Sequence, residues 1–199
     1  QIKQSVEATF GFTKATKINY PDKIPLIEAF DSSYEATAMG ERVAHLYIDP
    51  LSADIMIDGL RRAVRRKVRN NLPVTNFGLC HLVTGTPDFL NLWPKGSELD
   101  FSSKLRQKAA LVEDELLIES PIDERAMSFV KSTWCVEMWY EESDLREIEK
   151  ELGVSPGDVY TRTDLMQWLL YAAREILLTD DVFAEEHLGF IAELVGLLD

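Results

Sequence analysis

The chain has 199 residues, of which 46% are hydrophobic; this is enough to bury one large domain, or a domain with a smaller annex, and argues against disorder. It carries 21 basic and 34 acidic residues, and the imbalance lies in the second half: residues 1–100 hold 12 of each sign, whereas residues 101–199 hold 9 basic and 22 acidic. This excludes a protein that coats nucleic acid with its general surface, so any such contact must come from a local basic patch or from stacking.

The cysteines, histidines and apolar runs exclude several further classes. Cys80 and Cys135 are far apart and have no CxxC spacing, which favours free thiols in a reducing, cytoplasmic setting. The three histidines show no zinc-binding spacing, so we expect no metal site. No apolar run approaches the ~20 residues of a membrane helix, and no signal peptide is evident, so we expect no membrane partner. The first residue is Gln1 and not Met, which is consistent with a trimmed piece of a longer protein.

The first 48 residues predict a short helix over residues 1–15, then a small β-hairpin, and then one further helix. An apolar strand over residues 26–30 is followed by the turn sequence Asp-Ser-Ser and by a second, alternating strand over residues 34–37. Thr37 is then placed to cap a helix over residues 38–48.

From residue 52 onward the apolar periodicity is helical. The expected helices, given with their capping residues, cover 52–70, 75–83, 101–118, 120–142, 143–152, 155–178 and 180–198. The expected N-caps are Ser52, Thr75, Ser120, Ser143, Ser155 and Asp180 or Asp181. The sum is a mostly α protein, a multi-helix bundle of seven to nine helices with one hairpin, which we divide into residues 1–48 and residues 49–199.

No motif of a stand-alone enzyme is present. The chain lacks the GxxxxGK[ST] phosphate loop, an acidic box for magnesium and the GxSxG nucleophile turn. Adjacent acidic residues point to different helix sectors and indicate a solvated surface. We therefore expect no catalytic residue in this chain.

The segment GLRRAVRRKVRN aligns its arginines along one stripe of a helix, opposite an apolar stripe that includes Leu60 and Val64. One interpretation is a solvated face that pairs with the acidic second half. The other is a patch that docks a phosphate backbone or a partner, since guanidinium groups suit phosphate oxygens. The residues concerned are Arg61, Arg62, Arg65, Arg66 and Arg69.

The segment SPGDVYTRTDLMQW starts another helix and ends on a large ring. Ser155 and Asp158 match a capping box, with proline in the first helical position. Trp168 falls on a more polar line of this helix, so its ring either packs in the core or stacks on a base of a single strand. The line comprises Thr161, Asp164, Trp168, Ala172 and Glu175.

Three segments in order resemble one family. TAMGERVAHLYIDPLSADIM, LCHLVTGTPDF and TWCVEMWYEESDLREIEKELGVSPGDVYTRTDLMQWLLYAAREI are similar to segments of archaeal ski-two-type superfamily 2 DNA helicases, relatives of the HELQ repair helicases. The resemblance runs over most of residues 35–198. Each motif alone is weak, whereas the ordered set is specific.

The resemblance implies that residues 1–48 hold a remnant or part of a winged helix and that residues 49–199 form a helical ratchet domain. The motor domains, which would bind ATP and magnesium, are not in this chain, so it would hold no cofactor itself. In the family, a long ratchet helix lies beside the unwound strand, and a Trp and an Arg on it contact bases. Trp168 matches that Trp by its distance from the Gly-Asp pair of the capping turn.

The sequence departs from the family at two points. The family often has a basic pair directly after its Gly-Asp-hydrophobic motif, where this chain has Tyr160 and Thr161, and Arg162 lies one place further on. A winged helix needs about three helices before its wing, and residues 10–37 leave little room for them, so contact with duplex DNA is not expected.

Two hypotheses about the function of this chain are consistent with its sequence. The first is a non-catalytic accessory region of an ATP-dependent helicase that guides single-stranded DNA along residues 155–178, with the helicase motor domains as partners. Its expected DNA-binding residues on that helix are Tyr160, Thr161, Arg162, Asp164 and Trp168. The alternative is a helical protein-interaction scaffold without direct nucleic-acid contact, whose acidic second half would suit a basic protein partner.

Overall fold

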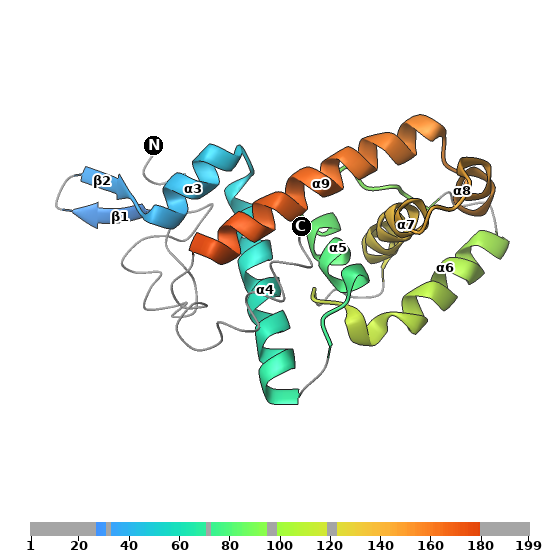
Figure 1. Cartoon of the computed structure of the whole chain (residues 1–199), viewed down its shortest axis with the longest axis horizontal. Coiled ribbons are helices and arrows are strands. Elements are labelled where there is room, and N and C mark those ends of the chain that lie inside the picture. The colour runs from blue at the N-terminus through green and yellow to red at the C-terminus, as the bar shows by residue number, and fades with distance from the viewer. Residues whose placement is uncertain (1–26, 31–32, 71–72, 95–98, 119–122, 180–199) are drawn as a thin grey trace.

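The computed structural model describes residues 27–30, 33–70, 73–94, 99–118 and 123–179 (Figure 1). The mostly helical fold is confirmed over these residues. The elements in chain order are β1 (Ile27–Phe30), β2 (Ser33–Ala36), α3 (Ala38–Leu46), α4 (Pro50–Asn70), α5 (Asn76–Thr84), α6 (Leu99–Leu111), the 3-10 turn η1 (Glu113–Glu115), α7 (Glu124–Tyr140), α8 (Leu145–Leu152) and α9 (Pro156–Thr179). The predicted helices over 1–15 and 180–198 lie outside the described residues.

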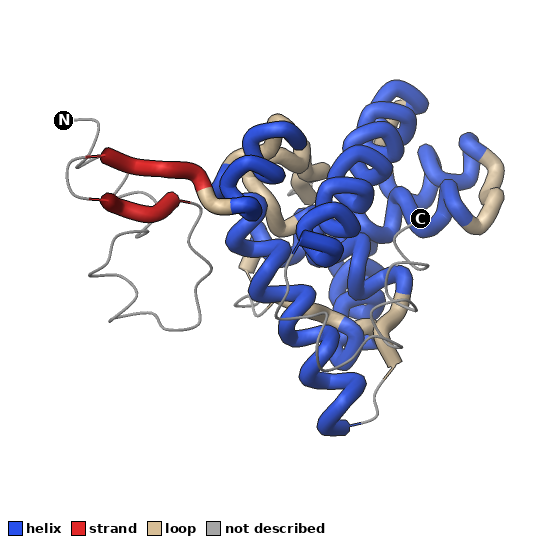
Figure 2. Tube along the Cα trace, turned by 60° about the vertical axis from the view of Figure 1, so that its left-hand side comes forward, coloured by secondary structure: helices blue, strands red, loops and turns tan. Residues whose placement is uncertain are grey.

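The longest helix, α9, connects the two ends of the bundle. It begins beside α8 and ends beside α3 (Figure 1), and on the way it packs against α7, α5 and α4. The antiparallel pair β1–β2 extends from the α3 end (Figures 1 and 2), with Ile27 opposite Ala36. The boundary between residues 48 and 49 stays a prediction.

Two hydrophobic clusters form the core, and α9 contributes to both. The first lies among α3, α4, α5 and α9 and includes the fully buried Leu60, Leu82 and Leu169. The second lies among α5, α6, α7 and α8 and includes Ile148, with Val159 from the start of α9. Burial of side chains of this size stabilises a fold by roughly 1.5–3 kcal/mol each. The buried face of α9 therefore holds the two halves of the bundle together.

The end of α6 differs from the prediction. The helix expected over 101–118 stops at Leu111, and the chain continues through η1 toward α4 and α5. The carbonyl oxygen of Glu115 approaches α5 so closely that a Cβ on Gly78 would meet it at 2.5 Å. The Thr75 hydroxyl also donates to the Glu115 carboxylate. These contacts with distant residues end the helix, and its own apolar periodicity contains no sign of them.

Several helix starts follow their local motifs and others do not. Thr37 and Thr75 cap α3 and α5 as predicted, each accepting a hydrogen bond from the backbone N–H three residues on.

The predictions for Ser52, Ser120 and Ser143 are wrong. The helix α4 begins at Pro50, and the Asp49 carboxylate accepts from the N–H of Leu51 at 2.7 Å; Asp123 caps α7 and Asp144 caps α8. A carboxylate at these positions suits the positive end of the helix dipole.

None of the described helices is both long enough and apolar enough to cross a membrane.

The helix α8 ends at Gly153, whose φ of 61° places it in the left-handed region that glycine adopts at low cost. This sharp ending directs the chain into the turn that starts α9.

Candidate nucleic-acid interface

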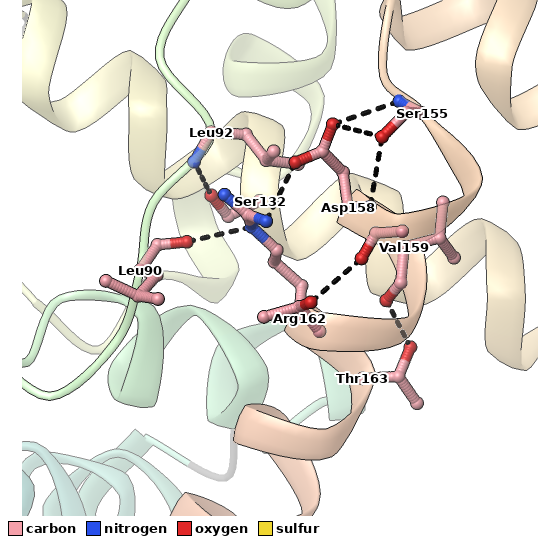
Figure 3. A network of polar contacts seen from close by, with 10 residues as sticks. Leu90, Leu92, Ser132, Ser155, Asp158, Val159, Arg162 and Thr163 are labelled. Atoms are coloured by element: carbon pink, nitrogen blue, oxygen red, sulfur yellow. Dashed lines mark hydrogen bonds and ion pairs between the residues drawn. The ribbon is translucent and has the colours of Figure 1, made fainter.

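A reciprocal capping box fixes the start of α9. The N–H of Ser155 donates to the Asp158 carboxylate at 3.0 Å, and the Ser155 hydroxyl donates to the same oxygen at 2.8 Å. The N–H of Asp158 donates back to the Ser155 hydroxyl at 3.3 Å (Figure 3). The predicted cap is confirmed, and it satisfies backbone donors that the first helical turn leaves without partners.

Arg162 binds the protein itself. Its Nε donates to the carbonyl oxygen of Leu90 at 3.0 Å, and its Nη1 donates to Asp158 at 2.8 Å (Figure 3). Only 16% of its side chain is exposed. Arg162 therefore positions the start of α9 against the loop that follows α5.

That loop, residues 85–94, is fixed on three sides. Leu92 donates its N–H to the Ser132 hydroxyl of α7 at 2.8 Å (Figure 3), and the Asn91 amide donates to the Thr84 carbonyl at 2.8 Å. The Asp88 carboxylate accepts from the N–H of Asp49 at 2.8 Å, just before α4. The first half of α9 thus rests on a loop that α4, α5 and α7 all hold in place.

One line of α9 faces solvent along much of the helix. Tyr160 is 51% exposed and meets the ring of Trp139 edge-on, with centroids 5.4 Å apart. The Thr161 hydroxyl donates to the Gly157 carbonyl at 2.8 Å, and the residue as a whole is exposed. The exposed residues of α9 are Gly157, Tyr160, Thr161, Asp164, Gln167, Tyr171 and Leu178.

Trp168 lies at the edge of this exposed line. Its ring is partly buried and packs against the cluster formed by α3, α4, α5 and α9. Two other members of the predicted polar line lie elsewhere: Ala172 is fully buried, and Glu175 pairs with Arg174 at 2.7 Å and with Arg42 of α3 at 3.3 Å. Ala172 therefore does not belong to the exposed face of α9.

The arginine stripe of α4 has a different environment. Arg62 donates from Nη1 to the Leu117 carbonyl at 3.3 Å, and Arg66 donates from Nη1 to the Asp114 carbonyl at 2.8 Å. Arg61 is partly buried and Arg65 is exposed. Arg69 belongs to α4, but its side chain is outside the described residues. Arg62 and Arg66 thus bind the chain that follows α6.

Sequence reasoning missed Tyr171, which is 51% exposed. It follows Tyr160 by 11 residues, which is close to three turns of a helix. This spacing could have identified it, because a residue three turns from an exposed tyrosine shares its face.

Two titratable side chains that pack in the core have strongly shifted pKa values. Burial lowers the pKa of His81 to about 4, and its ring stacks on Phe77 with centroids 6.4 Å apart. Burial, with a smaller contribution from the charge of Glu137, raises the pKa of the Cys80 thiol to about 12. Within the described ranges, no group of three or more His, Cys, Asp and Glu side chains is placed to hold a metal ion.

The chain is similar to known helicases. The family model described as archaeal helicase, domain 4, matches residues 77–193. The ATP-dependent DNA helicase Hel308 of Methanocella arvoryzae is 30% identical over 158 residues, which cover 76% of this chain and 20% of that protein. The protein of the same name from Pyrococcus horikoshii is 32% identical over 151 residues, or 75% of this chain and 20% of the relative. The chain spans about a fifth of the length of these curated relatives.

Proposed function

Because the chain belongs to the archaeal helicase domain 4 family, we propose that it is a non-catalytic accessory region of a DNA helicase that guides single-stranded DNA along α9. The observation that carries the proposal is the exposed line of this helix. Its opposite face is buried in both hydrophobic clusters, so the helix is held rigidly, while rings and polar groups remain open to a strand. Rigid presentation of aromatic rings suits sequence-tolerant binding, because every base has a face that can stack.

Three polar or aromatic groups at the start of α9 are the proposed contacts. Tyr160 and Asp164 are exposed one turn apart, and Thr161 lies beside them. Arg162, which shares this segment of sequence, supports them from below through Leu90 and Asp158. We assign it a positioning role and not a direct contact with DNA.

The proposed role of Trp168 depends on both the packed part and the accessible part of its ring. Its packing against the core fixes the ring, and the part that remains accessible borders the exposed line. A ring fixed in this way loses little conformational entropy on stacking against a base. Replacement should therefore weaken DNA binding more than exposure alone would suggest.

The test is a fluorescence titration of labelled oligothymidylate with the wild-type chain, Trp168→Ala and Trp168→Phe. Loss of a stacked base should cost roughly 1–3 kcal/mol in Trp168→Ala, and Trp168→Phe should retain most of the affinity. Trp93→Ala is the matched control, because Trp93 is 56% exposed on the fixed loop and outside the proposed contacts. Equal affinities of Trp168→Ala and wild type for the oligonucleotide would contradict the stacking role of Trp168.

The partners follow from the same proposal. They are single-stranded DNA and the motor domains of a helicase, to which ATP and magnesium would bind. The α4 arginines stay candidates for a phosphate contact, and Arg65 is the most accessible of those described.

A second candidate function, docking of a basic protein, rests on the 22 acidic and 9 basic residues of the second half. It predicts that none of the tryptophan variants changes DNA affinity. The titration above therefore separates the two candidates.

A further inference from the structure

The exposed line of α9 contains aromatic and polar residues but no cation among its described members. The two arginines of the helix both have protein partners: Arg162 binds Leu90 and Asp158, and Arg174 binds Glu175 at 2.7 Å. Asp164 is the one charged residue on the line, and it is acidic. The line therefore repels phosphate groups and remains open to the uncharged faces of bases.

Tyr160 and Tyr171 lie at two ends of this segment. Eleven residues at about 1.5 Å each separate them by roughly 16 Å along the helix axis, and three turns bring them back to the same side. Each is 51% exposed. Asp164 and Gln167 lie between the two rings on the same side, at one and two turns from Tyr160.

We propose that Tyr171 is a second base-stacking site, and that a single strand runs along α9 with its bases toward Tyr160 and Tyr171 and its phosphates directed away from the helix. This rests on the proposed function and adds an orientation to it. At the 3.4 Å spacing that stacked bases have in a duplex, the distance along the helix corresponds to about five nucleotide steps. Asp164 favours this orientation because it stands where an inward-facing phosphate would lie.

The experiment uses the full 199-residue chain and a fluorescein-labelled oligothymidylate, titrated over a range of salt concentrations. The variants are Tyr171→Ala, Tyr171→Phe and, as a matched control, Tyr140→Ala, because Tyr140 is 75% exposed at the end of α7. Thermal melting of each variant checks that the fold is intact. Tyr171→Ala should bind about tenfold more weakly, whereas Tyr171→Phe and Tyr140→Ala should match wild type.

The salt series tests the orientation. Loss of a stacking ring should leave the slope of log affinity against log salt unchanged, whereas loss of a phosphate contact would reduce it by about one. Asp164→Asn should change affinity by less than about twofold if phosphates face away, since screening weakens its effect at a distance. A several-fold gain in Asp164→Asn, or a lower salt slope in Tyr171→Ala, would overturn the orientation.

The outcomes separate this inference from the function on which it rests. If the wild-type chain binds no oligothymidylate, the proposed function and the second stacking site both fail. If wild type binds and Tyr171→Ala equals Tyr140→Ala, only the second stacking site fails.

Discussion

The helices α4 and α9 present two different surfaces, and the sequence of each helix predicts poorly which of its side chains are accessible. The stripe of α4 is dense in arginine, yet Arg62 and Arg66 donate to the carbonyl oxygens of Leu117 and Asp114. The exposed line of α9 contains no cation among its described residues, yet its rings and hydroxyl groups remain open. A guanidinium has five donors and binds carbonyl oxygens as readily as phosphates, so charge density in a sequence does not measure accessible charge.

Binding to either surface can be measured only on the folded protein, and His81 makes the stability of the fold depend on pH. Its pKa is lowered to about 4 by burial, against 6.5 for the ordinary imidazole, so the unfolded chain binds a proton that the folded chain excludes. Stability from this group is complete above pH 6.5 and falls as the pH drops toward 4, by up to about 1.4 kcal/mol for each pH unit.

Urea denaturation at pH 7 and pH 5 measures this effect. His81→Leu should lose less stability between the two pH values than wild type. An identical pH dependence in His81→Leu and wild type would contradict the assignment.

Arg162 tests whether an arginine of α9 belongs to the scaffold. Arg162→Ala removes hydrogen bonds to Leu90 and Asp158 and should lower the free energy of unfolding by about 1–3 kcal/mol. Arg162→Lys should not restore it, because an ammonium group lacks the planar fork. Thr161→Ala, on the exposed line, should change stability by less than about 0.5 kcal/mol. Unchanged stability with lost DNA binding in Arg162→Ala would reverse the assignment.

Within α4, Arg62 and Arg65 offer a smaller contrast. Arg62→Ala should cost about 1 kcal/mol of stability through the Leu117 carbonyl, and Arg65→Ala less than about 0.5 kcal/mol. Chemical denaturation of both variants checks this. A phosphate contact by α4 would instead appear as a salt slope that falls by about one in Arg65→Ala. Equal stability losses in the two variants would remove the distinction between bound and exposed arginines.

Local chemistry made part of the structure predictable. The capping box of Ser155 and Asp158 spans three residues, and Thr37 and Thr75 cap their helices through equally short contacts, so a motif suffices to predict them. The buried face of α9 likewise follows from its apolar periodicity.

Contacts between residues far apart in the chain determine the features that the sequence did not predict. Arg162 and Leu90 are separated by 72 residues, so no spacing rule connects them. The early end of α6 depends on α4 and α5, which hold the carbonyl oxygens that follow it. Ala172 is fully buried in the cluster of α3, α4, α5 and α9, whereas the neighbouring Tyr171 is 51% exposed. Tertiary packing sets each of these outcomes.

The most direct test of the central claim is amide and side-chain NMR of the chain titrated with oligothymidylate above pH 6.5. The claim predicts shift changes at Tyr160, Thr161, Asp164, Trp168 and Tyr171, with little change at Arg61 to Arg66. Changes confined to the α4 arginines, or absent from α9, would contradict a strand path along α9.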